Sequence, residues 1–106
     1  MNQNPVSAAS LQTAADLAPD ACVVLLVDDQ MIIGEAVRRI LAGQAGIRFH
    51  YCQRGLDAVA TAAKLQPTVI LQDLVMPDAD GLDLVKAYRE HVATQQTPIV
   101  VLSSKE

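Results

Sequence analysis

The chain has 106 residues, enough for one domain and too few for two. Its formal net charge of −4 disfavours unaided nucleic-acid binding, and no stretch approaches the roughly 18 consecutive apolar residues of a membrane span. No Lys or Arg precedes Arg38, so the amino terminus lacks the basic start of a signal peptide. We therefore expect a cytoplasmic protein without a membrane or nucleic-acid partner.

Residues 1–20 are rich in Ala, Gln, Asn and Ser and have no strong hydrophobic period, so we predict a flexible leader there and a folded domain over residues 21–106. The apolar run Val23–Val27 predicts a buried strand. The next apolar residues recur at helical spacing and predict a helix that covers one face of a sheet: Ile33, Val37, Ile40 and Leu41.

Residues 47–51 alternate between apolar and polar side chains, which predicts a strand at the edge of the sheet. A second helix is expected after Gly55, and Pro67 limits its extension. Its predicted apolar face consists of Leu56, Val59, Ala60 and Ala63.

The apolar run Val69–Leu71 predicts the third strand, and Ile99–Leu102 predicts the fourth. Between them, Asp80-Gly81 predicts a turn and a helix start. The apolar residues of this third helix are expected to be Leu84, Val85, Tyr88 and Val92.

Alternating strands and helices favour right-handed crossovers and a parallel sheet. With the second strand at the edge, the predicted fold is α/β, a flavodoxin-like doubly wound parallel sheet with strand order 2-1-3-4. A complete domain of this type would still need a helix, a fifth strand and a final helix after Glu106, so we expect residues 21–106 to be a truncated domain.

Polar residues follow three of the predicted strands: Asp28-Asp29, Asp73, and Ser103-Ser104. Because the carboxyl ends of parallel strands meet at one edge of the sheet, these side chains should share a pocket. Clustered carboxylates repel one another, so the pattern predicts a hard divalent cation. The alternative for Asp28-Asp29 is a helix N-cap, but only one Asp can cap.

A carboxylate at the position of Asp73 can act as a nucleophile toward phosphorus, although it can also be a loop cap. The turn at Met76-Pro77 allows the Val75 carbonyl to face a metal. The Ser103 hydroxyl and the Ser104 amide are predicted donors to a phosphoryl oxygen, although serines after strands are common turn formers.

Other functional motifs find less support. Placing Gly81 at the invariant glycine of a calcium-binding loop puts apolar residues at its first and last ligand positions. No glycine-rich nucleotide-binding loop occurs. Cys22 and Cys52 should lie at opposite ends of neighbouring strands, about 15 Å apart, too far for a disulfide.

Together, the acid pair Asp28-Asp29, the run Asp73–Pro77, Asp80-Gly81 and Ser103 resemble the receiver domain of two-component response regulators, which has the CheY-like fold. The segments VLLVDDQ, EAVRR, PTVILQDLVMP and PIVVLSSKE are also similar to the receiver of Wsp-type regulators, whose output domain is a diguanylate cyclase.

This resemblance implies that Asp73 accepts a phosphoryl group from a kinase phosphohistidine. Mg²⁺ would be held by Asp29, Asp73 and the Val75 carbonyl, with Asp28 acting mainly through a bound water. Ser103 would turn toward the new phosphoryl group and switch the signalling surface. Leu74, Val75 and Ser104 complete the expected binding site. The implied partners are a histidine kinase and a receiver or output domain of the same family. We also expect a second copy of the chain as a partner, because the truncated sheet leaves the outer edge of the fourth strand unpaired.

The family's phosphate-pairing lysine and switch aromatic lie on the fifth strand, and Lys105 is not the equivalent of that lysine. One alternative is therefore a truncated or decoy receiver that binds partners without turning over signal. Another is a haloacid-dehalogenase-like phosphatase, but those enzymes resemble one another in an acid two residues past the nucleophile, where this chain has Val75. We expect a phosphoacceptor signalling domain rather than an enzyme.

Overall fold

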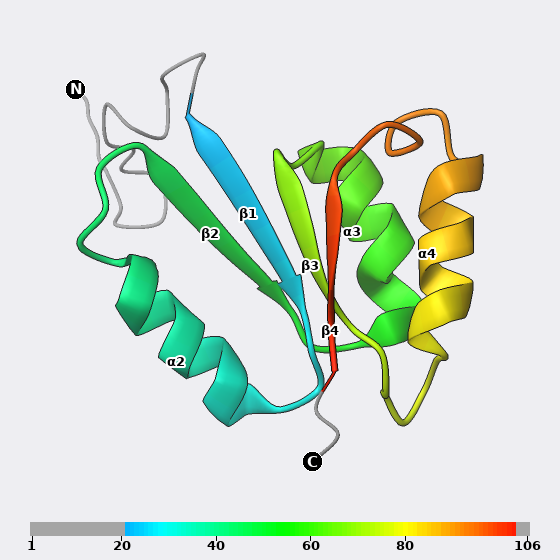
Figure 1. The fold of residues 1–106 in the computed structure, drawn as a ribbon, viewed down its shortest axis with the longest axis horizontal. Coiled ribbons are helices and arrows are strands. Elements are labelled where there is room, and N and C mark those ends of the chain that lie inside the picture. Colours follow the sequence, from blue (N-terminus) through cyan, green and yellow to red (C-terminus); the bar gives the residue numbers. More distant parts are fainter. Residues whose placement is uncertain (1–20, 104–106) are drawn as a thin grey trace, which may run out of the picture.

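The computed structural model describes residues 21–103, so the predicted leader over residues 1–20 and Ser104 lie outside the described part of the chain. Four parallel strands form one sheet in the order β2-β1-β3-β4 (Figure 1). This confirms the predicted flavodoxin-like strand order. The strands are β1 (Cys22–Val27), β2 (Ile47–Cys52), β3 (Val69–Asp73) and β4 (Ile99–Leu102).

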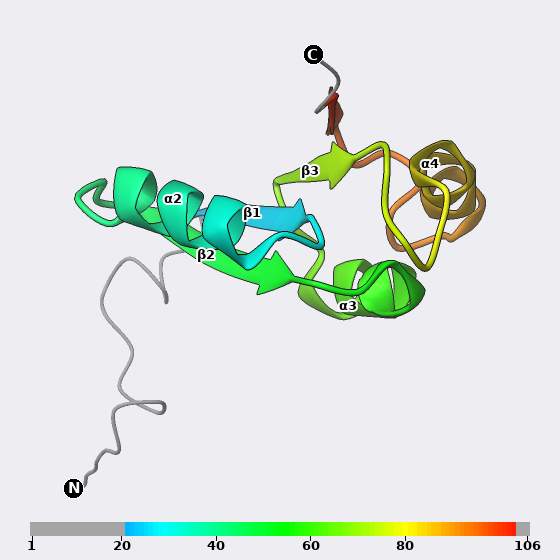
Figure 2. The ribbon, with the colours of Figure 1, turned by 90° about the horizontal axis from the view of Figure 1, so that it is seen from below.

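Helices cover the two faces of this sheet unequally. Figure 2 shows α2 (Met31–Leu41) over one face, with α3 (Ala58–Leu65) and α4 (Gly81–Glu90) against the other. A single 3₁₀ turn, η1 (Gly55–Asp57), precedes α3. Within residues 21–103, no helix has the length and apolar character needed to cross a membrane.

The hydrophobic core lies between the sheet and the α3/α4 pair. The solid apolar runs of β1 and β3 supply its centre, and Leu25, Val27 and Ile70 are completely buried. Parallel strands that are buried on both faces favour such continuous aliphatic sequences. The rest of the cluster consists of Cys52, Ala58, Ala62, Met76, Leu84 and Tyr88.

The helix α2 packs against the sheet with a different face from the predicted one. Gly34 is its only fully buried residue, and a Cβ there would lie 2.8 Å from the Tyr51 ring. This close approach places the contact line along Gly34, Val37 and Leu41, whereas Ile40 is 71% exposed. The predicted stripe of Ile33, Val37, Ile40 and Leu41 was therefore partly wrong, because hydrophobicity does not reveal a glycine contact.

Two further helix predictions need correction. Leu56 belongs to η1 and is exposed, while Ala58 and Ala62 form the buried side of α3. The helix α4 ends at Glu90, so Val92 lies in the following loop and is exposed.

Polar contacts fix the course of the chain after α4. Arg89 Nη1 donates hydrogen bonds to the carbonyl oxygens of Thr94, Gln95 and Thr97, and Thr94 Oγ1 donates to the Tyr88 carbonyl. These bonds satisfy backbone oxygens of the loop and allow the helix to stop before Val92.

A buried polar pair joins α4 to β3 next to the strand end. The Tyr88 hydroxyl donates to Gln72 Oε1 at 2.6 Å, and Gln72 Nε2 donates to the Asp73 carbonyl at 2.9 Å. Burial, and to a smaller extent the Cys52 thiol, raise the pKa of Tyr88. No pattern in the sequence distinguishes Gln72 from an ordinary strand residue, so this pair was not predicted.

Other strand predictions are confirmed. Within residues 21–103, β2 pairs only with β1 and forms an edge of the sheet. Cys22 lies opposite Ile47 and Cys52 lies opposite Val27, so the two thiols are at opposite ends of neighbouring strands and are free.

Candidate functional site: an acidic pocket at the carboxyl ends of the strands

Three carboxylates meet where β1 and β3 end. Asp28 and Asp29 follow β1 directly, and Asp73 is the last residue of β3. One carboxylate oxygen from each of the three lies within 4.8 Å of the others. The parallel order of the strands explains this meeting, because it brings their carboxyl ends to the same edge of the sheet.

The three carboxylates concentrate negative charge in a place from which water is largely excluded. Asp28 and Asp73 are 6% and 3% exposed. Burial raises the pKa of Asp28, and the charges of Asp73 and Asp29 raise it further, whereas the Gln30 backbone hydrogen bond opposes this shift. Three carboxylates that are close enough to repel one another form the oxygen-rich donor set that suits Mg²⁺.

The Tyr51 hydroxyl is a further sign of this charge. Burial raises the pKa of Tyr51, as do the negative charges of Asp28 and Asp29. Its oxygen is buried and has no hydrogen-bond partner within the described residues. The phenol thus lies within the field of the acid pair.

The simpler interpretation of Asp28-Asp29 as a helix cap does not account for both residues. The N-cap position of α2 is Gln30, and no side chain caps this helix end. Asp28 Oδ1 instead accepts a hydrogen bond from the Gln30 N–H at 2.8 Å. Neither carboxylate is therefore committed to the first turn of α2.

Ser103 lies beside the acid cluster. It lines a pocket of about 200 Å³ together with Asp28, Gln30, Ile33, Asp73 and Leu102. Its position follows from the register, since Leu102 is the partner of Asp73 across β3 and β4. The structure thus brings Ser103 together with two of the three predicted acids, while the predicted Ser104 lies outside the described residues.

The loop after Asp73 is held at its base. Asp73 Oδ1 accepts a hydrogen bond from the Val75 N–H at 3.2 Å, and the Gly81 N–H donates to the Leu74 carbonyl at 3.0 Å. A Cβ on Gly81 would lie 2.5 Å from the Asp73 carbonyl oxygen, so only glycine fits there. The predicted helix start is confirmed, because the Asp80 carboxylate caps α4 by accepting from the Leu82 N–H.

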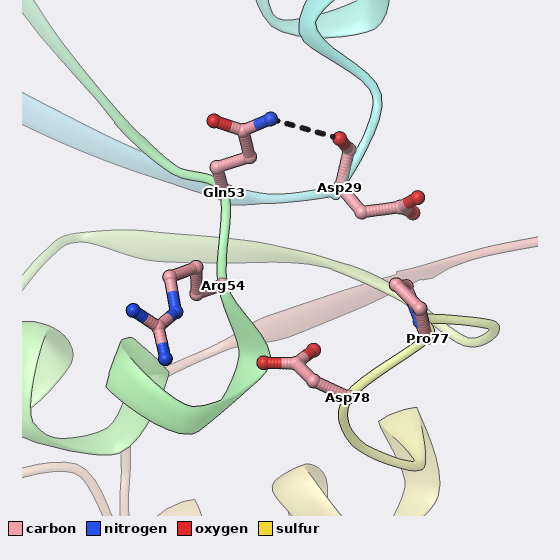
Figure 3. Close-up of a pocket in the computed structure, with 5 residues that line it drawn as sticks. All are labelled: Asp29, Gln53, Arg54, Pro77 and Asp78. Carbon is pink, nitrogen blue, oxygen red and sulfur yellow. Dashed lines mark hydrogen bonds between the residues drawn. The ribbon is translucent and has the colours of Figure 1, made fainter.

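A second pocket, of about 460 Å³, adjoins the cluster through Asp29. Its lining also includes Gln53, Arg54, Pro77 and Asp78, which come from the loops after β2 and β3 (Figure 3). Gln53, Arg54 and Asp78 were not predicted as site residues, and Pro77 was predicted only as part of a turn. Their sequence context offers no signal, since exposed polar residues in loops are common.

The comparison with known families decides the family to which the chain belongs. The sequence model of the response regulator receiver domain matches residues 24–106. The chain belongs to the response regulator receiver family. Receiver domains are phosphorylated by histidine kinases, are linked to output domains and bind Mg²⁺ at an acidic pocket.

Curated relatives of this receiver include much longer proteins. A protein-glutamate methylesterase/protein-glutamine glutaminase of Archaeoglobus fulgidus is 44% identical over 82 residues, which cover 76% of this chain and 22% of that protein. Protein PilG of Pseudomonas aeruginosa is 30% identical over 82% of this chain and 64% of its own length. The chain spans about a quarter or less of the first methylesterase relatives that it matches.

Solved structures agree with the receiver fold. Chemotaxis protein CheY4 of Vibrio cholerae superposes with a TM-score of 0.73 at 34% identity, covering 81% of this chain and 71% of that one. The Mn²⁺-bound form of response regulator Rcp1 gives a TM-score of 0.67 at 25% identity, over 80% of this chain and 67% of its own.

Proposed function

We propose that this receiver accepts a phosphoryl group on Asp73 from the phosphohistidine of a histidine kinase. The observation that carries the proposal is the meeting of three carboxylates at the strand ends, with oxygens within 4.8 Å of one another. Asp29, Asp73 and the Val75 carbonyl are the proposed Mg²⁺ ligands, and Asp28 acts mainly through a bound water. When bound, the ion neutralises negative charge on the phosphoryl oxygens.

In the proposed transfer, an Oδ atom of Asp73 forms a bond to phosphorus while the bond from phosphorus to the kinase imidazole breaks. The imidazole nitrogen keeps the electron pair and takes up a proton. The Ser103 hydroxyl and the Ser104 amide donate hydrogen bonds to phosphoryl oxygens, and Leu74 and Val75 complete the binding site. Ser103 then turns toward the phosphoryl group and changes the surface that partners recognise.

The proposed output is the activity of a diguanylate cyclase. Its support is the resemblance of four segments to Wsp-type receivers, whereas several relatives above carry the name of a methylesterase. The proposed partners are a receiver or output domain of the same family, including a second copy of this chain. Sequencing the gene beyond the codon for Glu106 tests the choice of output domain.

Two alternatives make different predictions for phosphoryl transfer. A decoy receiver would bind a kinase or another receiver without taking up the phosphoryl group. A phosphatase of the haloacid dehalogenase type would turn over a phosphoester, but Val75 stands where those enzymes have an acid. Uptake of one stable phosphoryl group supports the receiver over both.

The test is incubation with acetyl phosphate and Mg²⁺, followed by intact mass spectrometry. The parent chain should gain one phosphoryl group, and Asp73→Asn should gain none, because the amide cannot form the acyl phosphate. Asp80→Asn is a matched control, since Asn also caps helices well and Asp80 already serves as a cap. Undiminished uptake by Asp73→Asn would contradict the assignment, and no uptake by the parent would favour the decoy.

A further inference from the structure

One short segment after β2 contacts both loops of the acid site. Gln53 Nε2 donates a hydrogen bond to the Asp29 carbonyl at 3.3 Å (Figure 3). Two and three residues later, the N–H groups of Gly55 and Leu56 donate to the carboxylate of Asp78 at 3.1 and 3.0 Å. A segment of four residues therefore bridges the loop that carries Asp29 and the loop that carries Val75.

The Asp78 carboxylate contacts η1 through both of its oxygens. Its two carboxylate oxygens each accept one N–H, and these bonds, with the nearby Arg54, lower the pKa of Asp78. Packing adds to the hydrogen bonds, because a Cβ on Gly55 would lie 2.7 Å from Ala79 Cβ and 3.0 Å from Asp78 Oδ1. The loop thus approaches η1 as closely as a glycine permits.

The other anchors of the Asp73–Asp80 loop lie mostly at its base. Its base is closed by the Leu74–Gly81 hydrogen bond and by the bridge between Val75 and Asp80. At the tip, Met76 is buried in the core, but Pro77 and Asp78 are exposed. The Asp78 carboxylate provides the hydrogen bonds between this tip and η1, and the packing of Ala79 on Gly55 adds to them.

We propose that Asp78 and Gln53 are positioning residues for the metal site, because together they hold the Val75 loop at a fixed separation from Asp29. This inference rests on the proposed function, in which both loops supply metal ligands. Neither side chain is proposed to touch the ion. Without the Asp78 contact, the two loops would be less ordered in the ion-free protein. Mg²⁺ binding would then have to order them, and the free energy of this ordering would weaken the binding.

The test is a Mg²⁺ titration of the chain, read out by calorimetry and by the Mg²⁺-dependent rise in melting temperature. Asp78→Ala should raise the Mg²⁺ Kd roughly tenfold, the lower end of the loss expected when an outer partner of metal ligands is removed. Gln53→Ala should raise it less, because one hydrogen bond is lost instead of two. At saturating Mg²⁺, the rate of phosphoryl uptake by Asp78→Ala should return close to that of the parent.

Asp57→Ala is the matched control for charge. Asp57 belongs to the same η1 turn and pairs with Arg54 at 3.9 Å, so its removal deletes one negative charge from this region without removing the contact to the loop. Its Mg²⁺ Kd should stay within about twofold of the parent, as expected for an exposed charge in salt. Gly55→Ala changes no charge but crowds Asp78 and Ala79, so it should weaken Mg²⁺ binding.

The outcomes separate this inference from the proposed function. Equal Mg²⁺ Kd values for Asp78→Ala and Asp57→Ala would overturn the positioning role, even if the parent binds Mg²⁺ and takes up a phosphoryl group on Asp73. A lower melting temperature without Mg²⁺ and an unchanged Kd would show that Asp78 only stabilises the fold. If the parent did not bind Mg²⁺, the proposed function and this inference would both be wrong.

Discussion

The two faces of the sheet differ in how completely they are covered. On the face packed by α3 and α4, Leu25, Val27 and Ile70 are fully buried. On the face that carries α2, Leu26 is also fully buried, but Val100 of the outer strand is 49% exposed and α2 itself buries only Gly34. The difference follows the arrangement of the helices, because within residues 21–103 two helices pack against the first face and α2 alone covers the second.

The candidate site belongs to the less covered face. Val27 and Gln72 point toward α3 and α4, so the next residues, Asp28 and Asp73, point toward the opposite face. Together with Ile33 of α2, these two acids line the pocket beside Ser103. Most of the buried apolar surface therefore lies on one face, while the charged groups lie at the edge of the other. A site placed in this way can hold repelling carboxylates without disrupting the main core.

The largest expected effect comes from equal truncations on the two faces. Val27→Ala should lower the free energy of unfolding by about 2 to 3 kcal/mol, because it leaves a cavity in the closed core. Val100→Ala should cost about 1 kcal/mol or less, since its side chain is half exposed. Urea unfolding of both variants checks the difference, and equal losses would show that the two faces contribute alike.

Removing the Tyr88 hydroxyl should have the next largest effect. Tyr88→Phe leaves Gln72 Oε1 buried without its donor, which should cost about 1 to 3 kcal/mol in urea unfolding. The double variant Tyr88→Phe/Gln72→Leu should recover only part of this loss, because it removes the unpaired Oε1 but also the amide that donates to the Asp73 carbonyl. No difference between the single variant and the parent would show that the pair does not contribute to stability.

The raised pKa of Tyr88 also predicts a pH dependence. Because the folded protein keeps this phenol neutral above its ordinary pKa of 10.0, its contribution to stability is fully present below pH 10 and is lost as the pH rises beyond it. Urea unfolding between pH 9 and pH 11 should therefore show a smaller alkaline loss for Tyr88→Phe than for the parent.

A smaller effect is expected from the metal site on the other face. Mg²⁺ at about ten times its Kd should stabilise the parent by roughly 1.4 kcal/mol, since the ion binds only the folded state. Asp29→Ala should remove most of the corresponding rise in melting temperature. Asp83→Ala deletes an exposed acid of α4 and should keep that rise. An equal response of Asp29→Ala and the parent would place the cation elsewhere.

The smallest expected effect is self-association through the outer strand β4. Val100 and Val101 are 49% and 44% exposed, and no further strand pairs with β4 within residues 21–103. Exposed apolar edges recruit other strands, so the 106-residue chain should self-associate at micromolar concentration in sedimentation experiments. Val100→Lys should reduce the association, whereas Val92→Lys, a similar change in an exposed loop, should not. A compact monomer that unfolds cooperatively would contradict this expectation.

The sequence by itself determined the strand order, the edge position of β2 and the meeting of the acids. These follow from local patterns. Continuous apolar runs indicate buried strands, alternating apolar and polar residues indicate a solvent-exposed edge strand, and polar residues follow the strand ends. Because a parallel sheet brings those ends to one edge, Asp28, Asp29 and Asp73 could be placed together without coordinates.

Only the tertiary structure decided which side of each helix meets the sheet and what holds the site in shape. Gly34 sets the contact of α2 because it alone leaves room for the Tyr51 ring. The hydrogen bonds of Gln53, Asp78 and Tyr88 join residues 16 to 24 positions apart in the sequence. Such contacts depend on the distances between helices and strands after they have packed together, so no local pattern of residues specifies them.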